Sequence, residues 1–197
     1  MKSYTHNSLF RPGPNASLNA CVGDNGGPYD FGSYGEGFFF AGWHIVDAIK
    51  SGQWTLDLLI YPAAFSFRHG IELYVKHLLI LADRFLSTGV RIKKTHMLSD
   101  NWNSLSNLLS RLPPEAVNQL EVSNVDDIIA DFIQIDPSGQ VFRYPEDIKG
   151  NKHLTALGVI NVEVLADGMR VVFDCFETWD SSLISLLESK GIAPHSV

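Results

Sequence analysis

Apolar residues recur at intervals of three and four positions along most of this chain, the spacing that turns one face of an α-helix toward a core. Turn-forming pairs interrupt the pattern, among them Ser51-Gly52 and Pro113-Pro114, and such residues end helices. The pattern predicts five helices, at residues 36–50, 55–86, 100–111, 114–132 and 161–190. The fold class that we expect is therefore a mainly α bundle.

Three other segments flank or separate the predicted helices. Residues 1–34 hold too many Gly and Pro residues for a helix or a strand, so we expect an extended arm there. Two short alternating runs flank an Asp-Pro-Ser-Gly turn sequence, which predicts a small β-hairpin or an ordered loop at residues 133–145. With a short tail at residues 191–197, we expect one helical domain over residues 35–190.

The composition argues against several classes of protein. Apolar residues make up 45% of the 197 positions, but no uncharged apolar run reaches the length of a membrane span, so we predict no membrane contact. The first residues lack the apolar stretch of a secretory signal, which favours the cytoplasm. Cys21 and Cys175 match no zinc or disulfide spacing, and we expect neither a metal nor another cofactor. The net charge of −7 argues against a general electrostatic grip on nucleic acid.

The second predicted helix is apolar on almost every side, which is typical of a helix at the centre of a domain. Either Thr55 or Asp57 would cap it, and Pro62 is expected in its first turn, where the missing N–H costs nothing. A central helix leaves little room for charge, because an ionisable side chain is costly to bury unless it is paired.

Charged residues nevertheless form a stripe on this helix. Arg68, Glu72 and Lys76 recur at intervals of four and so lie on one side. His69 is beside them and His77 lies further along. One interpretation is a solvent-facing ladder of ion pairs, each worth about 0.2–0.5 kcal/mol. The other is a stripe that is partly buried or lines a cleft, in which Arg68 could hold an anion and His69 could act as acid or base.

Two further residues are candidates outside this helix. His96 precedes the third predicted helix, where a structural role is the simpler interpretation. Arg143 lies in the expected hairpin and could reach back to pair with Glu72. Alternatively, it could bond within its own loop, to Asp136 or Asp147. No nucleophile elbow, HExxH pair or calcium-loop motif occurs, so the sequence gives no support to a serine-hydrolase or metal mechanism.

Three stretches of the sequence resemble the HEPN-like helical proteins of bacteria. They are Tyr61-Pro62-x-x-Phe65-x-x-Arg68-His69-x-x-Glu72-Leu73-x-x-Lys76, His96 ahead of a helix with Trp and Leu, and Asp136-Pro-Ser-Gly-x-x-Phe142-Arg143-Tyr144-Pro145. The resemblance extends over residues 35–188. It implies a HEPN-like helical bundle that forms a homodimer. It also implies activity as a metal-independent endoribonuclease in a bacterial toxin–antitoxin or antiviral defence system.

The resemblance also implies roles for individual residues. Arg68 would stabilise phosphate charge, His69 would act in acid–base chemistry on the 2′-hydroxyl of RNA, and Glu72 would assist them. The residues expected to bind the RNA are Lys76, His77, His96, Arg143 and Tyr144.

The chain departs from the family signature in one respect. In that signature a histidine follows the arginine after four to six residues, whereas eight residues separate Arg68 from His77. Arg91 and His96 have a matching spacing, but the residue after Arg91 is apolar. The alternative function is a non-catalytic module that dimerises or binds a partner, such as an antitoxin or another defence protein.

Overall fold

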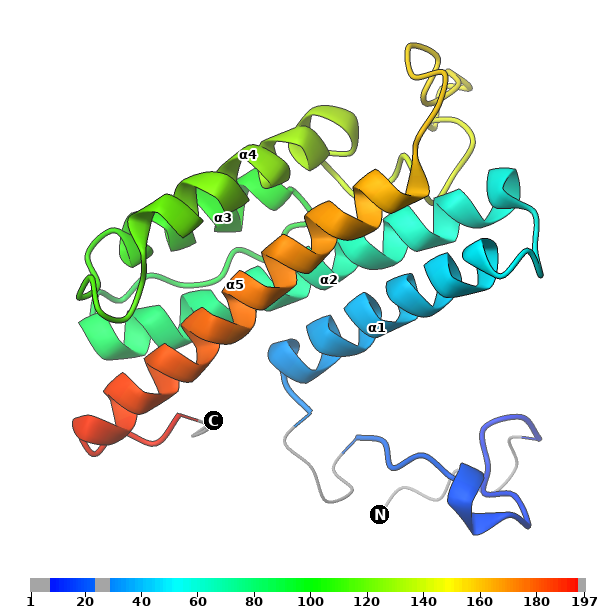
Figure 1. Ribbon diagram of the computed structural model, residues 1–197. Helices are drawn as coiled ribbons and strands as arrows, with labels where there is room; N and C mark the ends of the chain where they lie inside the picture. Colours follow the sequence, from blue (N-terminus) through cyan, green and yellow to red (C-terminus); the bar gives the residue numbers. More distant parts are fainter. Residues whose placement is uncertain (1–7, 24–28, 195–197) are drawn as a thin grey trace.

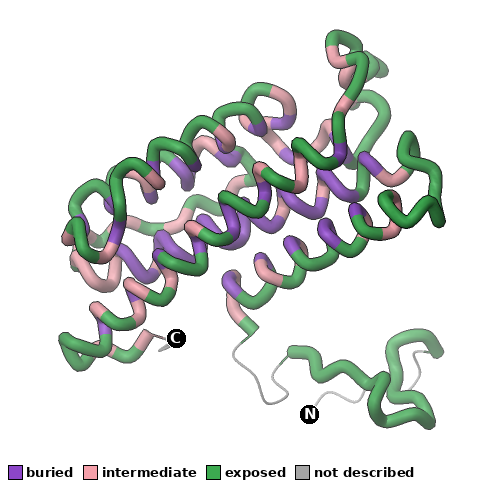
Figure 2. The backbone as a smooth tube through the Cα atoms, in the orientation of Figure 1, coloured by how far each residue is buried: buried purple, intermediate pink, exposed green. Residues whose placement is uncertain are grey.

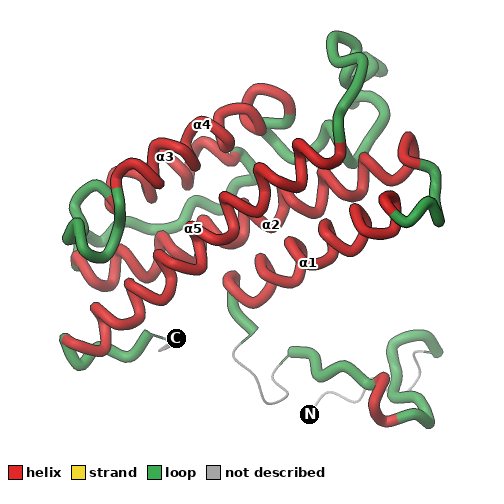
Figure 3. Tube along the Cα trace, viewed as in Figure 1, coloured by secondary structure: helices red, strands yellow, loops and turns green. Residues whose placement is uncertain are grey.

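The computed structural model describes residues 8–23 and 29–194, and within them it consists of five α-helices joined by loops (Figure 1). The helices are α1 (Phe31–Lys50), α2 (Leu56–Leu86), α3 (Leu98–Leu109), α4 (Gln119–Ile135) and α5 (Val162–Ser189). A short 3-10 helix, Ala16–Leu18, precedes them. The described residues contain no strand, only an isolated β-bridge between Glu146 and Lys152 (Figure 3). The mainly α prediction is confirmed, and the expected hairpin or ordered loop is the end of α4 followed by an ordered loop.

The first helix begins at residue 31 instead of 36, because Asp30 caps it. The Asp30 Oδ1 atom accepts the N–H of Ser33 at 3.0 Å, which satisfies a donor that the helix itself leaves free. Residues 31–34, predicted as the end of the arm, are therefore helical. The arm is exposed throughout residues 8–23 (Figure 2), while its residues 1–7 and 24–28 and the last three residues of the predicted tail lie outside the described residues.

The fourth helix begins at Gln119, later than the predicted start at residue 114. Asn118 provides the cap, since its Oδ1 accepts the N–H of Leu120 at 3.0 Å. The residues before it form a separate turn, in which the N–H of Ala116 donates to the carbonyl of Pro113. A proline can occupy the first turn of a helix, but here the asparagine cap sets the start.

Pro62 lies inside α2 beyond its first turn, so the prediction for this residue is wrong. Thr55 occupies the N-cap position without a side-chain bond to the helix. A proline at position 62 removes the N–H that would donate to the carbonyl of residue 58. Leu58 is exposed at this end of α2, where water can bond to that carbonyl instead.

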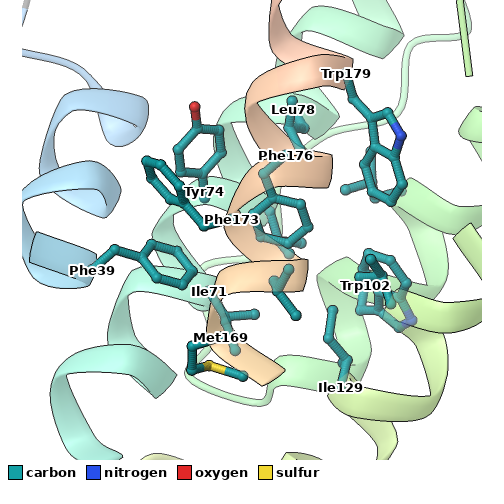
Figure 4. Packing of buried hydrophobic residues seen from close by; sticks show 14 of the residues in the cluster. Phe39, Ile71, Tyr74, Leu78, Trp102, Ile129, Met169, Phe173, Phe176 and Trp179 are labelled. Atoms are coloured by element: carbon teal, nitrogen blue, oxygen red, sulfur yellow. The ribbon is translucent and has the colours of Figure 1, made fainter. Parts of the chain in front are cut away.

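The second helix lies at the centre of the bundle and packs against α1, α3 and α5 (Figures 1 and 2). Figure 4 shows Phe39 of α1, Tyr74 of α2 and Phe173 of α5 on one side of this core. The ring centroids of Phe39 and Phe173 are 5.1 Å apart. Trp102 of α3 and Ile129 of α4 fill the other side. None of the described helices combines the length and the apolar character that a membrane span needs.

Glycines allow α1 and α2 to approach each other closely. A Cβ at Gly42 would lie 2.6 Å from the ring of Phe67, and one at Gly35 would lie 3.1 Å from the backbone nitrogen of Tyr74. Neither space admits a side chain without movement of the helices or of a large ring. The close approach fixes how α1 lies on α2, and so it holds Gly32 of α1 against His77 of α2.

Candidate polar site on the central helix

The charged stripe of α2 is buried. Arg68 is 1% exposed, Glu72 3% and Lys76 8%, although all three carry ionisable groups. The interpretation as a solvent-facing ladder is therefore wrong, and the interpretation as a buried stripe is right. Buried charges persist in proteins when they are paired and hydrogen-bonded, so the partners of these side chains define what the site can do.

Glu72 is the centre of what we call the Glu72 cluster, which consists of Arg68, Glu72, Lys76 and His96. One carboxylate oxygen accepts a hydrogen bond from Arg68 Nη1. The other lies 2.8 Å from Lys76 Nζ and 3.1 Å from His96 Nδ1. Burial by itself would raise the pKa of Glu72, but the hydrogen bond from Lys76 and the charges of Lys76 and Arg68 outweigh it, so the pKa lies below its ordinary value. Glu72 is thus held as a carboxylate.

Arg68 joins two loops to α2. Its Nε donates to the carbonyl of Asp136 at 3.3 Å, and its Nη2 donates to the carbonyls of His96 at 2.6 Å and Pro137 at 3.0 Å. Together with the bond to Glu72, these contacts use four of the five N–H donors of a guanidinium. An arginine so enclosed has no free face for a substrate phosphate, and its geometry is that of a tie between segments.

The loop after α4 is shaped around this arginine. Gly139 has a positive φ of 74°, and a Cβ there would lie 3.3 Å from the guanidinium carbon of Arg68. Asp136 is fully buried, and its Oδ1 accepts the N–H groups of Gln140 at 2.8 Å and Val141 at 3.2 Å. These bonds close the turn. The Asp-Pro-Ser-Gly sequence therefore forms a turn around a guanidinium.

Arg143 makes neither of the pairs that were considered for it, with Glu72 or with an aspartate of its own loop. Its guanidinium carbon instead lies 5.6 Å from the ring centroid of Phe65 and 5.3 Å from that of Tyr144. Its hydrogen bond to the Tyr144 hydroxyl is long, at 3.5 Å. Glu72 is already surrounded by three donors, so it has no need of a fourth. Arg143 remains at the surface, on aromatic rings.

His96 brings the buried network to the surface, and His69 lies next to Arg68 on α2. The His96 side chain is 68% exposed while its Nδ1 contacts Glu72, and no described residue bonds to its Nε2. His69 is half-buried, and its ring is parallel to that of Phe65, with centroids 5.7 Å apart. Burial lowers the pKa of His69, and the charges of Arg68 and Lys76 act in the same direction. His69 also senses the charge of His96, so the two rings belong to one electrostatic environment.

His77 does not join the Glu72 cluster. Its Nε2 lies 2.8 Å from Asp180 of α5, and its Nδ1 lies 3.5 Å from Asp30, the cap of α1. Its ring packs on Gly32, where a Cβ would come within 3.0 Å. The structure thus separates His77 from the other predicted site residues and places it where three helices meet.

A second cluster of polar side chains surrounds His77, and the sequence analysis did not predict it. We call it the His77 cluster, and it consists of Asp30, Glu36, Tyr74, His77, Glu177 and Asp180. The Tyr74 hydroxyl donates to Glu177. Burial raises the pKa of Tyr74, as does this bond, and burial together with the charges of Glu177 and Asp180 raises the pKa of Glu36. The only signal in the sequence is the three-residue spacing of Glu177 and Asp180 on a predicted helix.

Within residues 8–23 and 29–194, no three His, Cys, Asp or Glu side chains are placed so that they could hold a metal ion. His77 illustrates the reason, because each of its ring nitrogens already faces a carboxylate. A histidine needs a free nitrogen lone pair to ligate a metal.

No protein-family model, no curated protein and no solved structure matches this chain significantly. The resemblance to HEPN-like proteins therefore stays a prediction.

Proposed function

We propose that this chain is a HEPN-like protein that binds single-stranded RNA beside His69 and His96 and cleaves it without a metal ion. One observation carries the proposal: an exposed imidazole, His96, contacts a carboxylate that is buried and held ionised, Glu72. A carboxylate on one ring nitrogen fixes the tautomer and orients the other nitrogen, which is how acid–base histidines are commonly prepared. The proposed setting is a bacterial toxin–antitoxin or antiviral defence system in the cytoplasm, with the chain as a homodimer and a protein partner.

The proposed reaction divides acid and base work between the two histidines. His69 is kept neutral by burial, so it can take the proton of the RNA 2′-hydroxyl as the 2′-oxygen attacks phosphorus. His96, protonated at Nε2, gives that proton to the leaving 5′-oxygen as the P–O bond breaks. The products are a 2′,3′-cyclic phosphate and a 5′-hydroxyl, and proton exchange with water restores both rings.

Arg68, Glu72 and Lys76 have a different role in this proposal from the one that the resemblance implies. Arg68 and Lys76 are buried and bonded to Glu72, so they act on the substrate only through other groups. Glu72 orients His96, and Arg68 holds Glu72 and the loop that carries His96. They are positioning residues.

The test is cleavage of a fluorescently labelled single-stranded RNA in the presence of a chelator. Each of His96→Gln and His69→Gln is expected to slow cleavage by about 10²- to 10⁴-fold, the usual contribution of a general acid or base. His44→Gln is the matched control, because His44 is exposed on α1 and belongs to neither cluster. Unchanged cleavage in both site variants, with folding verified by circular dichroism, would refute the catalytic assignment.

A second candidate function is a non-catalytic module that binds a partner or a second copy of itself. The observation that favours it is that the Glu72 cluster is closed: the buried cations and the carboxylate satisfy one another and four donors of Arg68 are in use. Such a network can serve only to fix loops. Wild-type protein that cleaves no RNA under any metal condition, yet forms a dimer in analytical ultracentrifugation, would favour this candidate over the first.

A further inference from the structure

A cavity of about 430 Å³ lies between the start of α2 and the loop after α4. Its walls are Tyr61, Pro62, Phe65, Phe142, Arg143 and Tyr144. Four of these six side chains are aromatic and one is a guanidinium, so nearly every wall is flat. The cavity has the size of a small-molecule site, and the ring of one wall residue, Phe65, is parallel to that of His69 at a centroid distance of 5.7 Å.

The guanidinium of Arg143 is available to a ligand. It is exposed, and its contacts are the rings of Phe65 and Tyr144 and a long hydrogen bond to the Tyr144 hydroxyl. Among residues 8–23 and 29–194, no carboxylate pairs with it. An arginine without a carboxylate partner keeps its paired N–H donors for an anion, and those donors match the oxygens of a phosphate.

Flat groups continue from the cavity toward His69. Arg143 lies on Phe65, and the ring of His69 is within 8° of parallel to that of Phe65. Phe38 of α1 lies roughly perpendicular to both rings, at centroid distances of 4.5 Å from His69 and 6.4 Å from Phe65. Proteins that bind single-stranded nucleic acid use aromatic side chains and arginine in this way, because each unpaired base has a flat face to stack.

The loop that carries the cavity is held rigidly. The carbonyl of Gln140 accepts the N–H groups of Arg143 at 3.1 Å and Tyr144 at 3.0 Å. Gln140 in turn donates its own N–H to Asp136, whose carbonyl is bonded to Arg68. Arg68 thus helps to position Arg143 and Tyr144 although it does not line the cavity. The buried Glu72 cluster is in this way connected to the surface loop.

We infer that this cavity binds one unpaired nucleotide, with the base against Phe65 and Tyr144 and the phosphate on Arg143. The inference rests on the proposed function in one respect: it places that nucleotide next to the phosphate that His69 and His96 would cleave. It adds a substrate class, because a base held in a duplex cannot enter the cavity. The nucleotide can belong to a single-stranded RNA or be a free mononucleotide, and the chemistry of recognition is the same.

Binding is tested with a fluorescein-labelled octamer of 2′-O-methyladenosine, which lacks the free 2′-hydroxyl and so cannot be cleaved. Fluorescence anisotropy is expected to show tight binding to the wild-type protein and binding about 5- to 100-fold weaker for Tyr144→Ala and for Arg143→Ala. Arg170→Ala is the matched control. Arg170 is also exposed and also lies over an aromatic ring, that of Trp43 at 3.7 Å, but it is on α5 and lines no part of this cavity.

Two competitors separate the sources of the nucleotide. Adenosine monophosphate that displaces the octamer from wild-type protein, and binds less well to Tyr144→Ala, assigns the cavity to single nucleotides as well as to RNA. An octamer that binds in the same Tyr144-dependent way while the monophosphate does not compete assigns it to a strand. A duplex of the same length is expected not to compete.

The outcomes distinguish this inference from the proposed cleavage. Octamer binding that depends on Arg143 and Tyr144, without cleavage of unmodified RNA, supports the nucleotide site and refutes the nuclease. Cleavage of unmodified RNA with equal octamer affinity in wild type, Arg143→Ala and Tyr144→Ala overturns the nucleotide site and leaves the nuclease standing. Absence of octamer and monophosphate binding to the wild-type protein also overturns the inference.

Discussion

The Glu72 cluster and the His77 cluster are both built on α2, where Glu72 and His77 are five residues apart, yet their charges are balanced in opposite ways. In the Glu72 cluster a single carboxylate is surrounded by Arg68, Lys76 and His96. In the His77 cluster four carboxylates, including Asp180, face one histidine and one tyrosine. The first cluster lowers the pKa of Glu72, whereas the second raises the pKa values of Glu36 and Tyr74.

Burial explains why the balance differs. The Glu72 cluster is closed on all sides except at His96, so each of its charges must be matched by a partner inside the protein. The His77 cluster lies at the end of α1, where Glu177 is exposed and Asp30 and Asp180 are half-buried. Water can solvate the excess of negative charge there. We therefore predict that the Glu72 cluster contributes more to stability than the His77 cluster. We also predict that the contributions of Glu72 and Glu36 change in opposite directions with pH.

The largest effect is expected from Arg68→Ala. Removal of the guanidinium leaves Glu72 buried beside a single cation and frees the carbonyls of three loop residues, so we expect a loss of about 3–5 kcal/mol in the free energy of unfolding. Urea denaturation measures it. Arg170→Ala is the control, with an expected loss of about 1 kcal/mol or less for an exposed arginine on a ring. Equal losses in the two variants would mean that the Glu72 cluster is no more than a set of surface contacts.

A smaller effect is expected from His77→Ala, about 1–3 kcal/mol, because water can replace the imidazole at two partly exposed carboxylates. The loss should be local. Hydrogen exchange is expected to become faster in the first turn of α1, since the ring packs on Gly32 and contacts the cap of that helix. His44→Ala on the exposed side of α1 should change neither quantity. Exchange that accelerates evenly over all helices would contradict the local role.

Much of the Glu72 cluster could be predicted from the sequence because it follows from the geometry of one helix. Intervals of four place Arg68, Glu72 and Lys76 on one side, and an apolar surround indicates a central helix. The partners of Arg68 could not be predicted. They are carbonyls of His96, Asp136 and Pro137, and periodicity says nothing of the paths that loops take.

The His77 cluster could not be predicted either, because periodicity within one helix does not show which residues of other segments it contacts. Its members come from three helices, and the pairing of His77 with Asp180 depends on how α2 and α5 pack against each other. The start of α1 illustrates a related difficulty. Asp30 caps the helix from within a segment rich in glycine, and a composition typical of a flexible arm concealed a cap that depends on one side chain.

The smallest predicted effect concerns pH, because ionisation of Glu72 stabilises the fold and ionisation of Glu36 destabilises it. The pKa of Glu72 is lowered in the folded protein, so its contribution to stability is present above its ordinary value of 4.5 and is lost as the pH falls through the folded pKa. The pKa of Glu36 is raised from the same ordinary value, chiefly by burial. Its ionisation therefore destabilises the fold, and stability is regained as the pH falls through the raised pKa toward 4.5.

Urea denaturation from pH 7 to well below pH 4.5 distinguishes the two residues, because the Glu36 effect falls above that value and the Glu72 effect below it. At pH 7 Glu36→Gln is expected to stabilise the protein slightly, by about 0.5 kcal/mol or less, because its side chain is only partly buried and solvent weakens the effect. The advantage over the wild-type protein should shrink as the pH falls. Glu72→Gln should show a deficit at pH 7 that stays constant down to about pH 4.5 and shrinks only below it, because the wild-type protein loses the same ion pairs as the pH falls through the lowered pKa of Glu72. If Glu36→Gln lowers the free energy of unfolding at pH 7 by as much as Glu72→Gln does, the ionised carboxylate stabilises the fold in both clusters. The prediction that the two clusters respond oppositely to pH would then be wrong.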